Sequence, residues 1–266
     1  MTFELVDIGA NLTHHAFDRE RDSVISRAGD VGVAVMIVTG STVEVSRNAL
    51  ALARAYPGIL YATAGVHPHH AGEAPADVGD ELRNLYRHPE VVAIGECGLD
   101  LFRNFSTPED QERVFRSQLE LACELNAPVF LHQRDAHERF MSILREYRPR
   151  LARAVAHCFT GGSAELEDCL ALGLYIGITG WICDERRGAH LRPLIPRIPA
   201  DRLMIETDAP YLLPRDLEPR PKSRRNEPAC LPHVLAAVAA AARRDIETLA
   251  RETTANARRF FALGAT

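Results

Sequence analysis

The chain has 266 residues, of which 46% are hydrophobic and 25% charged, an ordinary composition for a soluble globular enzyme. A net charge of −5 argues against a broad basic face for duplex nucleic acid, but it allows a site that binds a few phosphates locally. The sequence has no apolar membrane span and no secretory leader pattern, so we expect a cytoplasmic protein without a membrane partner. The six cysteines form no CxxC pair, which favours reduced thiols.

Eight short apolar runs recur along the chain, each too short for a helix and rich in β-branched residues or glycine. They begin at Leu5, Val33, Leu60, Val91, Pro128, Ala154, Leu174 and Arg202. Helical patterns lie between them. Thr107 and Pro108 supply an N-cap and a first-turn proline, and the stretch from Leu231 to Phe261 predicts two helices separated near Arg243.

Alternation of strands and helices requires parallel strand pairing, and eight such repeats predict an α/β fold, a single closed (β/α)8 TIM barrel. We expect one domain over residues 1–266, with the active site at the C-terminal ends of the strands. A doubly wound open sheet is the competing fold, but no GxGxxG motif follows the first run.

Polar side chains gather at the predicted C-terminal ends of these strands. They are Asp7, Asn11, His67, His69, Glu96, Asp100, His132, Arg134, His157, Glu206 and Asp208. A lone histidine at a strand end is more often a hydrogen-bonded structural residue than a ligand. However, His132 and His157 occupy equivalent positions in register with Glu96 and Asp208, and two histidines with two carboxylates suit a metal site. Glu206 is expected on the opposite face of its strand or beside a ligand.

A basic segment from Arg215 to Arg225, including Lys222 and Arg224, follows the last predicted strand. Such a segment is usually a solvated loop. At the mouth of a barrel, contact with substrate phosphate is an equally weighted alternative.

Six stretches, in order along nearly the whole chain, resemble the TatD family of metal-dependent deoxyribonucleases in the amidohydrolase-like superfamily. They are Gly65-Val-His-Pro-His, Ile94-Gly-Glu-Cys-Gly-Leu-Asp, His132-x-Arg-Asp-Ala, Ala156-His-Cys-Phe-Thr-Gly, Ile205-Glu-Thr-Asp-Ala-Pro-Tyr-Leu and Arg225-Asn-Glu-Pro. Further stretches, Asp7-Ile-Gly-Ala-Asn-Leu-Thr, Gly180-Trp and Cys183-Asp-Glu-Arg-Arg-Gly, are similar to the branch that carries the family's own name.

The resemblance implies roles for individual residues. The metal ligands would be Glu96, His132, His157 and Asp208, with Glu96 and Asp208 also catalytic. The residues near the substrate phosphate would be His67, Arg134 and Arg225. We expect Asp7, Asn11 and Glu206 to support these residues without touching the metal.

The first strand departs from many relatives, which begin Asp-x-His-x-His. Gly9 and Asn11 occupy the two histidine positions here, and neither replaces an imidazole as a strong ligand. A permanently held second metal is therefore not expected. A loosely held Mg²⁺, completed by water and substrate phosphate, fits better, with Mn²⁺ and Zn²⁺ as alternatives.

The resemblance implies a metal-dependent 3′→5′ exonuclease, a hydrolase acting at the 3′ ends of single-stranded DNA or RNA, in DNA repair or nucleic-acid turnover. The metal would polarise a phosphoryl oxygen and supply or orient a hydroxide while Asp208 accepts a proton. With 6% aromatic residues, a long base-stacking track is not expected.

Two other functions are weighed against this one. The first is a hydrolase of the same superfamily that cleaves an ester or amide, for example in aminoacyl-tRNA deacylation. The second is a non-catalytic partner in secretion, against which the ring of predicted ligands argues. A monomer is the default expectation.

Overall fold

The structure is a computed structural model that describes residues 4–219 and 223–264, so the predicted phosphate contact at Lys222 lies outside the described residues. Eight strands form one sheet, in the order of the chain. They are β1 (Leu5–Ala10), β2 (Val33–Val38), β3 (Leu60–Ala64), β4 (Val91–Asp100), β5 (Val129–Arg134), β6 (Ala154–Ala156), β7 (Tyr175–Ile178) and β8 (Leu203–Ile205). Every strand pair with a described register is parallel, which confirms the predicted (β/α)8 TIM barrel.

Helices follow most strands, as the alternating pattern predicts. They are α1 (Arg21–Asp30), α2 (Val43–Ala55), α3 (Val78–Tyr86), α4 (Pro108–Leu125), α5 (His137–Tyr147), α6 (Ser163–Ala171), α7 (Leu231–Ala242) and α8 (Ile246–Phe261). Short 3₁₀ turns, not an α-helix, connect β7 to β8. The last two helices separate at Arg243, which takes a left-handed conformation, and Asp245 then caps α8. The predicted break near Arg243 is therefore confirmed.

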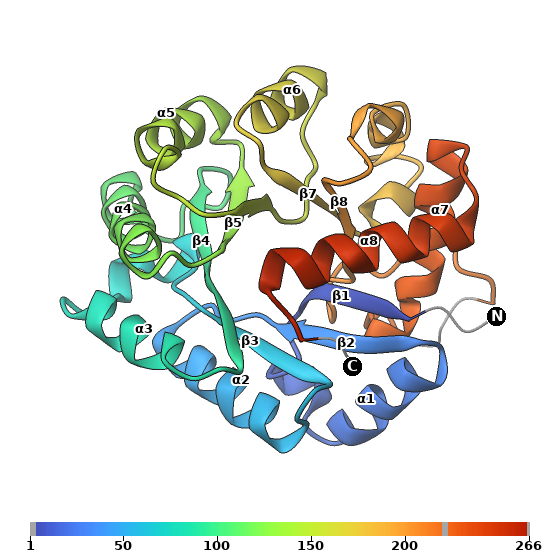
Figure 1. Ribbon diagram of the computed structural model, residues 1–266, viewed down its shortest axis with the longest axis horizontal. Helices are drawn as coiled ribbons and strands as arrows, with labels where there is room; N and C mark the ends of the chain where they lie inside the picture. The colour runs from blue at the N-terminus through green and yellow to red at the C-terminus, as the bar shows by residue number, and fades with distance from the viewer. Residues whose placement is uncertain (1–3, 220–222, 265–266) are drawn as a thin grey trace. The chain divides into compact units, whose positions relative to one another are not determined.

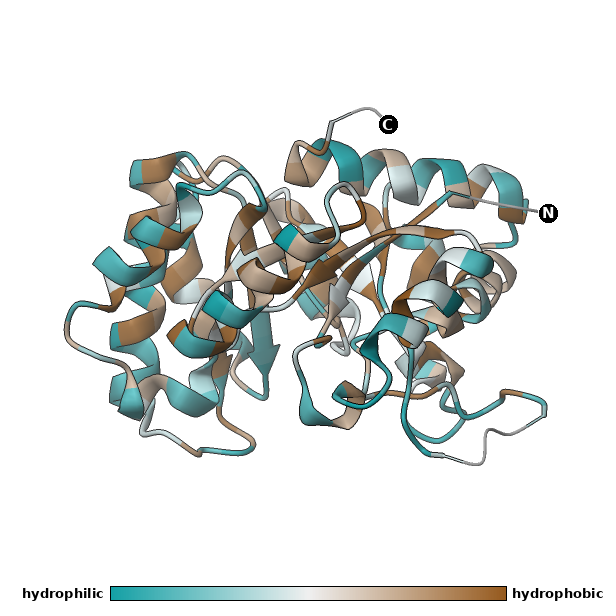
Figure 2. Ribbon diagram, turned by 90° about the horizontal axis from the view of Figure 1, so that it is seen from below, coloured by the Kyte–Doolittle hydropathy of each residue, from teal (hydrophilic) through white to brown (hydrophobic). Residues whose placement is uncertain are grey.

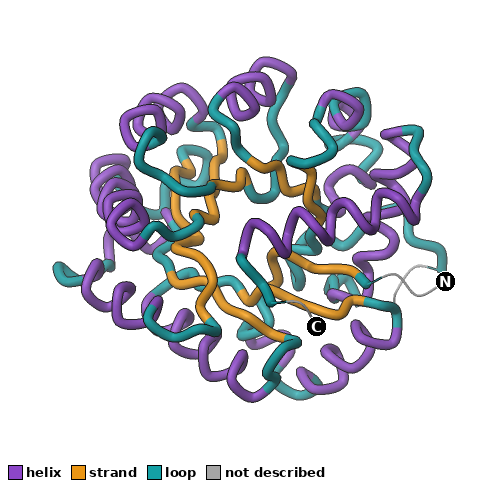
Figure 3. The backbone as a smooth tube through the Cα atoms, in the orientation of Figure 1, coloured by secondary structure: helices purple, strands orange, loops and turns teal. Residues whose placement is uncertain are grey.

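The chain divides into two compact units. The terminal unit comprises Met1–Val38, Cys158–Glu167 and Ile176–Thr266, and the central unit comprises Thr39–His157 and Asp168–Tyr175. Helices α2 to α5 lie outside the strands β3 to β5 (Figure 1 and Figure 3). The strands are predominantly apolar, whereas the helices carry both apolar and polar residues (Figure 2). The expectation of a single domain over residues 1–266 stays a prediction.

In the terminal unit, the first strand lies beside the last. Ala10 pairs with Ala209 in a parallel bridge, and the backbone N–H of Asp208 donates to the carbonyl of Gly9 over 2.8 Å. Helix α8 runs alongside β1 (Figure 1). Its Asn256 side chain donates to the carbonyl of Leu203, at the start of β8. The N-terminal ends of these strands are thus covered, and their C-terminal ends remain available for chemistry.

In the central unit, α4 shows how the sequence determines a helix and its buried face. The hydroxyl of Thr107 accepts the backbone N–H of Asp110, as an N-cap requires. Val114 and Phe115 are fully buried, and the Phe115 ring stacks on Phe140 of α5 with 5.4 Å between centroids. This packing holds α4 and α5 against β4 and β5, the strands that carry most of the candidate site.

No helix among the described residues is both long enough and apolar enough to span a membrane. All six cysteines are free thiols, which agrees with the predicted absence of disulfides.

Candidate active site

Two glycines of β4 lie where a side chain would not fit against β5. Gly95 and Gly98 have φ values of 128° and 150°. A Cβ atom at Gly98 would lie 1.8 Å from the carbonyl oxygen of His132, so any side chain there would push β5 away. Glu96, which follows Gly95, lies beside His132.

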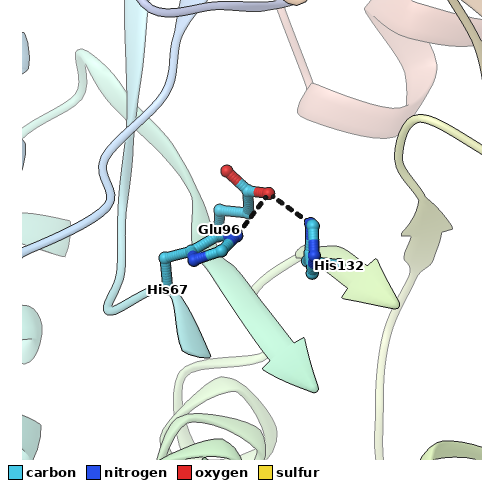
Figure 4. Close-up of side chains that lie close together, drawn as sticks. All are labelled: His67, Glu96 and His132. Carbon is cyan, nitrogen blue, oxygen red and sulfur yellow. Dashed lines mark hydrogen bonds and ion pairs between the residues drawn. The ribbon is translucent and has the colours of Figure 1, made fainter. Parts of the chain in front are cut away.

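Glu96 stands at the centre of a group of imidazoles in the central unit. Its Oε1 atom lies 2.8 Å from His132 Nδ1 and 3.4 Å from His67 Nε2 (Figure 4). His157 Nε2 lies 3.4 Å from the same oxygen, and its ring packs against Phe130 with 4.6 Å between centroids. The structure therefore brings together three of the predicted ligands, Glu96, His132 and His157, with His67. We call these four residues the Glu96 group.

The charges of the Glu96 group favour a cation. Burial raises the pKa of Glu96, but the facing imidazoles of His67 and His157 and the hydrogen bond with His132 outweigh it and hold the pKa well below its usual range. Glu96 is therefore ionised although it is buried. The pKa of His132 is raised, because its carboxylate neighbours Asp100 and Glu96 outweigh the effect of burial. A positive charge is thus stabilised at this position.

His67 differs from the other imidazoles because of its hydrogen bond to the backbone. Its Nδ1 accepts the N–H of His69 over 3.1 Å, so a neutral His67 carries its proton on Nε2. Burial lowers the pKa of His67 well below its usual value, although the facing Glu96 carboxylate acts in the opposite direction. An Nε2–H at this place can donate to an anionic oxygen, which suits the predicted phosphate contact better than metal ligation.

Asp100 lies behind His132 at the end of β4. Its Oδ2 is 3.7 Å from His132 Nε2 and accepts a hydrogen bond from His69 over 2.7 Å. Burial raises the pKa of Asp100, but the facing imidazoles and the N–H of Arg103 outweigh it and hold the pKa well below its usual range. Metal-binding histidines commonly have such a carboxylate on the far side of the ring.

The donor set of the Glu96 group fits a bound cation. Carboxylates face both ring nitrogens of His132, Glu96 at Nδ1 over 2.8 Å and Asp100 at Nε2 over 3.7 Å. Glu96, His132 and His67 also have ligand atoms within 4.8 Å of one another. The chain thus contains a group able to hold a metal ion.

The terminal unit holds the remaining predicted ligand, Asp208, in a left-handed conformation with φ of 54° just after β8. The predicted strand ran to Asp208, whereas β8 ends at Ile205. Asn11 donates to Asp208 Oδ1 over 3.0 Å, and the carbonyl of Gly9 accepts the backbone N–H of Asp208. The two positions that hold histidines in many relatives therefore orient Asp208 here. Whether Asp208 binds metal stays a prediction.

Asp7 and Glu206 are buried carboxylates of the terminal unit. The two oxygens of Asp7 accept hydrogen bonds from the backbone N–H and the hydroxyl of Thr207, over 2.9 and 2.5 Å. Burial nevertheless raises the pKa of Asp7 to about 7. Glu206 Oε1 accepts the backbone N–H of Cys158 over 2.6 Å. Asp7 and Asn11 thus hold the segment that carries Asp208, which suits their predicted supporting role.

The two arginines predicted to bind phosphate lie in different surroundings. The Arg134 guanidinium rests 4.2 Å from the ring centroid of Phe102. Arg225 instead bonds to Glu227 over 2.6 Å, to Glu20 over 2.9 Å, and to the carbonyl of Ala16. A phosphate at Arg225 would compete with two carboxylates, so its predicted role finds no support in this arrangement and stays a prediction.

Sequence reasoning did not assign roles to Asp100 and His69. Both stand at predicted strand ends, and Asp100 closes the Ile94–Asp100 stretch that resembles the family. Their pairing joins residues 31 apart in the sequence, and a single sequence does not reveal such a pairing.

Comparison with known proteins identifies the family. The family model described as TatD related DNase matches residues 6–262. A protein of Erwinia tasmaniensis named "3'-5' ssDNA/RNA exonuclease TatD" is 58% identical over 259 residues, covering 97% of this chain and all of that protein. One of the same name from Erwinia amylovora is 57% identical over the same share of each chain.

Among solved structures, a TatD homolog from Escherichia coli K12 superimposes with a TM-score of 0.89 at 29% identity, covering 99% of this chain and all of that one. The fold and the site thus belong to a TIM-barrel protein of the DNase class. The chain is a member of the TatD family, as its sequence stretches predicted.

Proposed function

We propose that this chain is a metal-dependent 3′→5′ exonuclease that hydrolyses phosphodiester bonds of single-stranded DNA and RNA. Relatives at 54–58% identity carry the name of this activity over their whole length. The observation that carries the proposal is the Glu96 group, in which an ionised carboxylate faces three imidazoles. Such a group can bind a metal cation, and the bound cation can in turn bind an anionic substrate.

The metal would be held by Glu96, His132 and His157, and the sequence adds Asp208 to this set. A divalent cation bound there would polarise a phosphoryl oxygen and make water more acidic. From the sequence we propose Mg²⁺. The imidazoles of the Glu96 group instead favour a borderline ion such as Zn²⁺. The activity test below therefore compares Mg²⁺, Mn²⁺ and Zn²⁺.

Residues of the chain have separate tasks in this proposal. His67 donates its Nε2–H to a phosphate oxygen, and Arg134 neutralises a second phosphate charge. Asp208 accepts the proton of the attacking water. The side-chain amide of Asn11 holds the Asp208 carboxylate in place. Asp100 orients His132 from behind.

The test is degradation of single-stranded DNA labelled at its 5′ or its 3′ end, by chelated protein to which Mg²⁺, Mn²⁺ or Zn²⁺ is returned. We expect the 5′-labelled strand to shorten stepwise and the 3′ label to be released first. His132→Ala should abolish both, whereas His88→Ala, a histidine in the turn before β4, should change neither.

Two outcomes would contradict the proposal. Metal-loaded protein that leaves DNA and RNA intact but cleaves an ester or amide would favour the other hydrolase. Degradation that survives His132→Ala would place the chemistry elsewhere.

A further inference from the structure

Two phenylalanines project into solvent from the loop between β4 and α4. Phe102 is 54% exposed and Phe105 is 68% exposed. They are two of the three large aromatic side chains exposed among the described residues, the other being Tyr211. An exposed pair of rings costs solubility without adding to the core, so it calls for a binding explanation.

The loop that carries these rings is fixed to the candidate site at both ends. Asp100 Oδ1 accepts the backbone N–H of Phe102 over 3.0 Å and that of Arg103 over 2.8 Å. At the other end, the Ser106 hydroxyl donates to the carbonyl of His69 over 3.0 Å. The carboxylate beside His132 therefore also positions Phe102.

Each ring already has a cationic or imidazole neighbour. Arg134 lies over one face of Phe102, at 4.2 Å from the centroid. His69 meets Phe105 edge to face, with 4.8 Å between centroids. Arg103 also lies over the Phe102 ring, at 5.7 Å from the centroid, and Phe102 remains 54% exposed beside these two arginines.

This chemistry fits an unpaired nucleobase better than a protein surface. Bases of single strands stack on aromatic rings and on arginine planes, and both kinds of side chain occur in this loop beside the Glu96 group. The loop from Leu101 to Thr107 offers two phenyl rings, Arg103 and Asn104, but no exposed aliphatic side chain. The loop also begins at Asp100, which contacts the Glu96 group.

We propose that Phe102 and Phe105 form a stacking platform for one or two unpaired bases of the strand bound at the Glu96 group. The proposal rests on the proposed function, because the strand it holds is the one to be hydrolysed. Stacking tolerates every base, so the platform selects single strands over duplexes with little sequence preference.

The experiment measures binding without cleavage. Single-stranded DNA with 2-aminopurine at its terminal or penultimate 3′ position is titrated with wild-type protein in EDTA. Stacking should quench the fluorescence. Phe102→Ala and Phe105→Ala should each weaken binding roughly 5- to 100-fold and relieve the quenching.

Matched variants separate stacking from simple apolar contact. Phe102→Leu keeps apolar bulk but loses the flat ring, so it should behave like Phe102→Ala, whereas Phe102→Tyr should bind like wild type. Ile59→Ala removes an exposed apolar side chain, 41% exposed, before β3 and should have no effect. DNA that lacks the base at the probed 3′ position should have a low affinity for the wild-type protein. This affinity should match that of normal DNA for Phe102→Ala.

Each remaining outcome bears on one proposal or the other. An unquenched probe, or equal affinity of the alanine variants and wild type, would overturn the platform while leaving the exonuclease proposal intact. If the protein quenches the probe but hydrolyses no DNA with any metal, the exonuclease proposal would be overturned and the stacking platform would remain. Wild-type self-association that the alanine variants lose in sedimentation would show that the rings form a protein interface instead.

Discussion

Glu96 in the central unit and Asp7 in the terminal unit are both buried carboxylates on strands of one sheet, yet they have opposite electrostatics. Glu96 faces three imidazoles, and its pKa lies well below the usual range. Asp7 is bonded only to neutral donors, the N–H groups of Gly9 and Thr207 and the Thr207 hydroxyl, and its pKa rises to about 7. Burial alone therefore does not identify a metal ligand. The charge of the neighbouring groups is what distinguishes Glu96, which we propose as a ligand, from Asp7.

The largest expected effect comes from replacing each carboxylate by its neutral amide. Glu96→Gln should lower kcat/KM on single-stranded DNA on the order of 10³-fold, because the site loses the charge that holds a cation. Asp7→Asn should leave activity within about tenfold, because its partners are neutral donors. Steady-state kinetics on labelled DNA measures both, and equal losses would remove the distinction between the two carboxylates.

Asp100→Asn tests whether the carboxylate behind His132 tunes metal binding. We expect the metal concentration needed for half-maximal activity to rise about 10- to 100-fold, since a neutral amide supports the imidazole less well. Activity titrated against Mg²⁺ or Mn²⁺ gives this value. A lowered kcat with an unchanged metal requirement would instead assign Asp100 to another step.

The raised pKa of Asp7 predicts a pH dependence of stability. Between the ordinary carboxyl pKa and about 7, folded Asp7 binds a proton that the unfolded chain has released, so its contribution to stability falls as pH rises through this range. From about pH 5 to about pH 7.5, wild type should lose about 2–3 kcal/mol of unfolding free energy more than Asp7→Asn. Urea unfolding of both proteins at the two pH values measures this difference. An equal change of unfolding free energy in wild type and Asp7→Asn would refute the raised pKa of Asp7.

The smallest effects separate Arg134 from Arg225. Arg134→Ala should raise KM for single-stranded DNA several-fold, because one phosphate charge loses its partner, with unchanged stability. Arg225→Ala should lower the thermal unfolding midpoint slightly, because Glu20 and Glu227 lose one of the two arginines that they contact, Arg27 being the other. Steady-state kinetics and thermal unfolding of both variants measure the KM and the stability of each. A raised KM with unchanged stability for Arg225→Ala would restore its predicted phosphate contact.

The sequence by itself determined the barrel and the family. Strand and helix order follow from local hydrophobic patterns and caps such as Thr107, which act over a few residues. The family stretches are local too, so Glu96, His132 and His157 could be named before their proximity was known. The boundary of β8 was predicted less well, because a backbone turn at Asp208 ends the strand pattern.

Only the tertiary structure decided what each polar residue meets. Asp7 bonds to Thr207, 200 residues away, and Arg225 to the carbonyl of Ala16, 209 residues away. The tautomer of His67, the support of His132 by Asp100 and the exposure of Phe102 likewise depend on such contacts. Electrostatic and hydrogen-bonding energies are set by distances of a few ångströms between groups, and only the folded chain defines those distances.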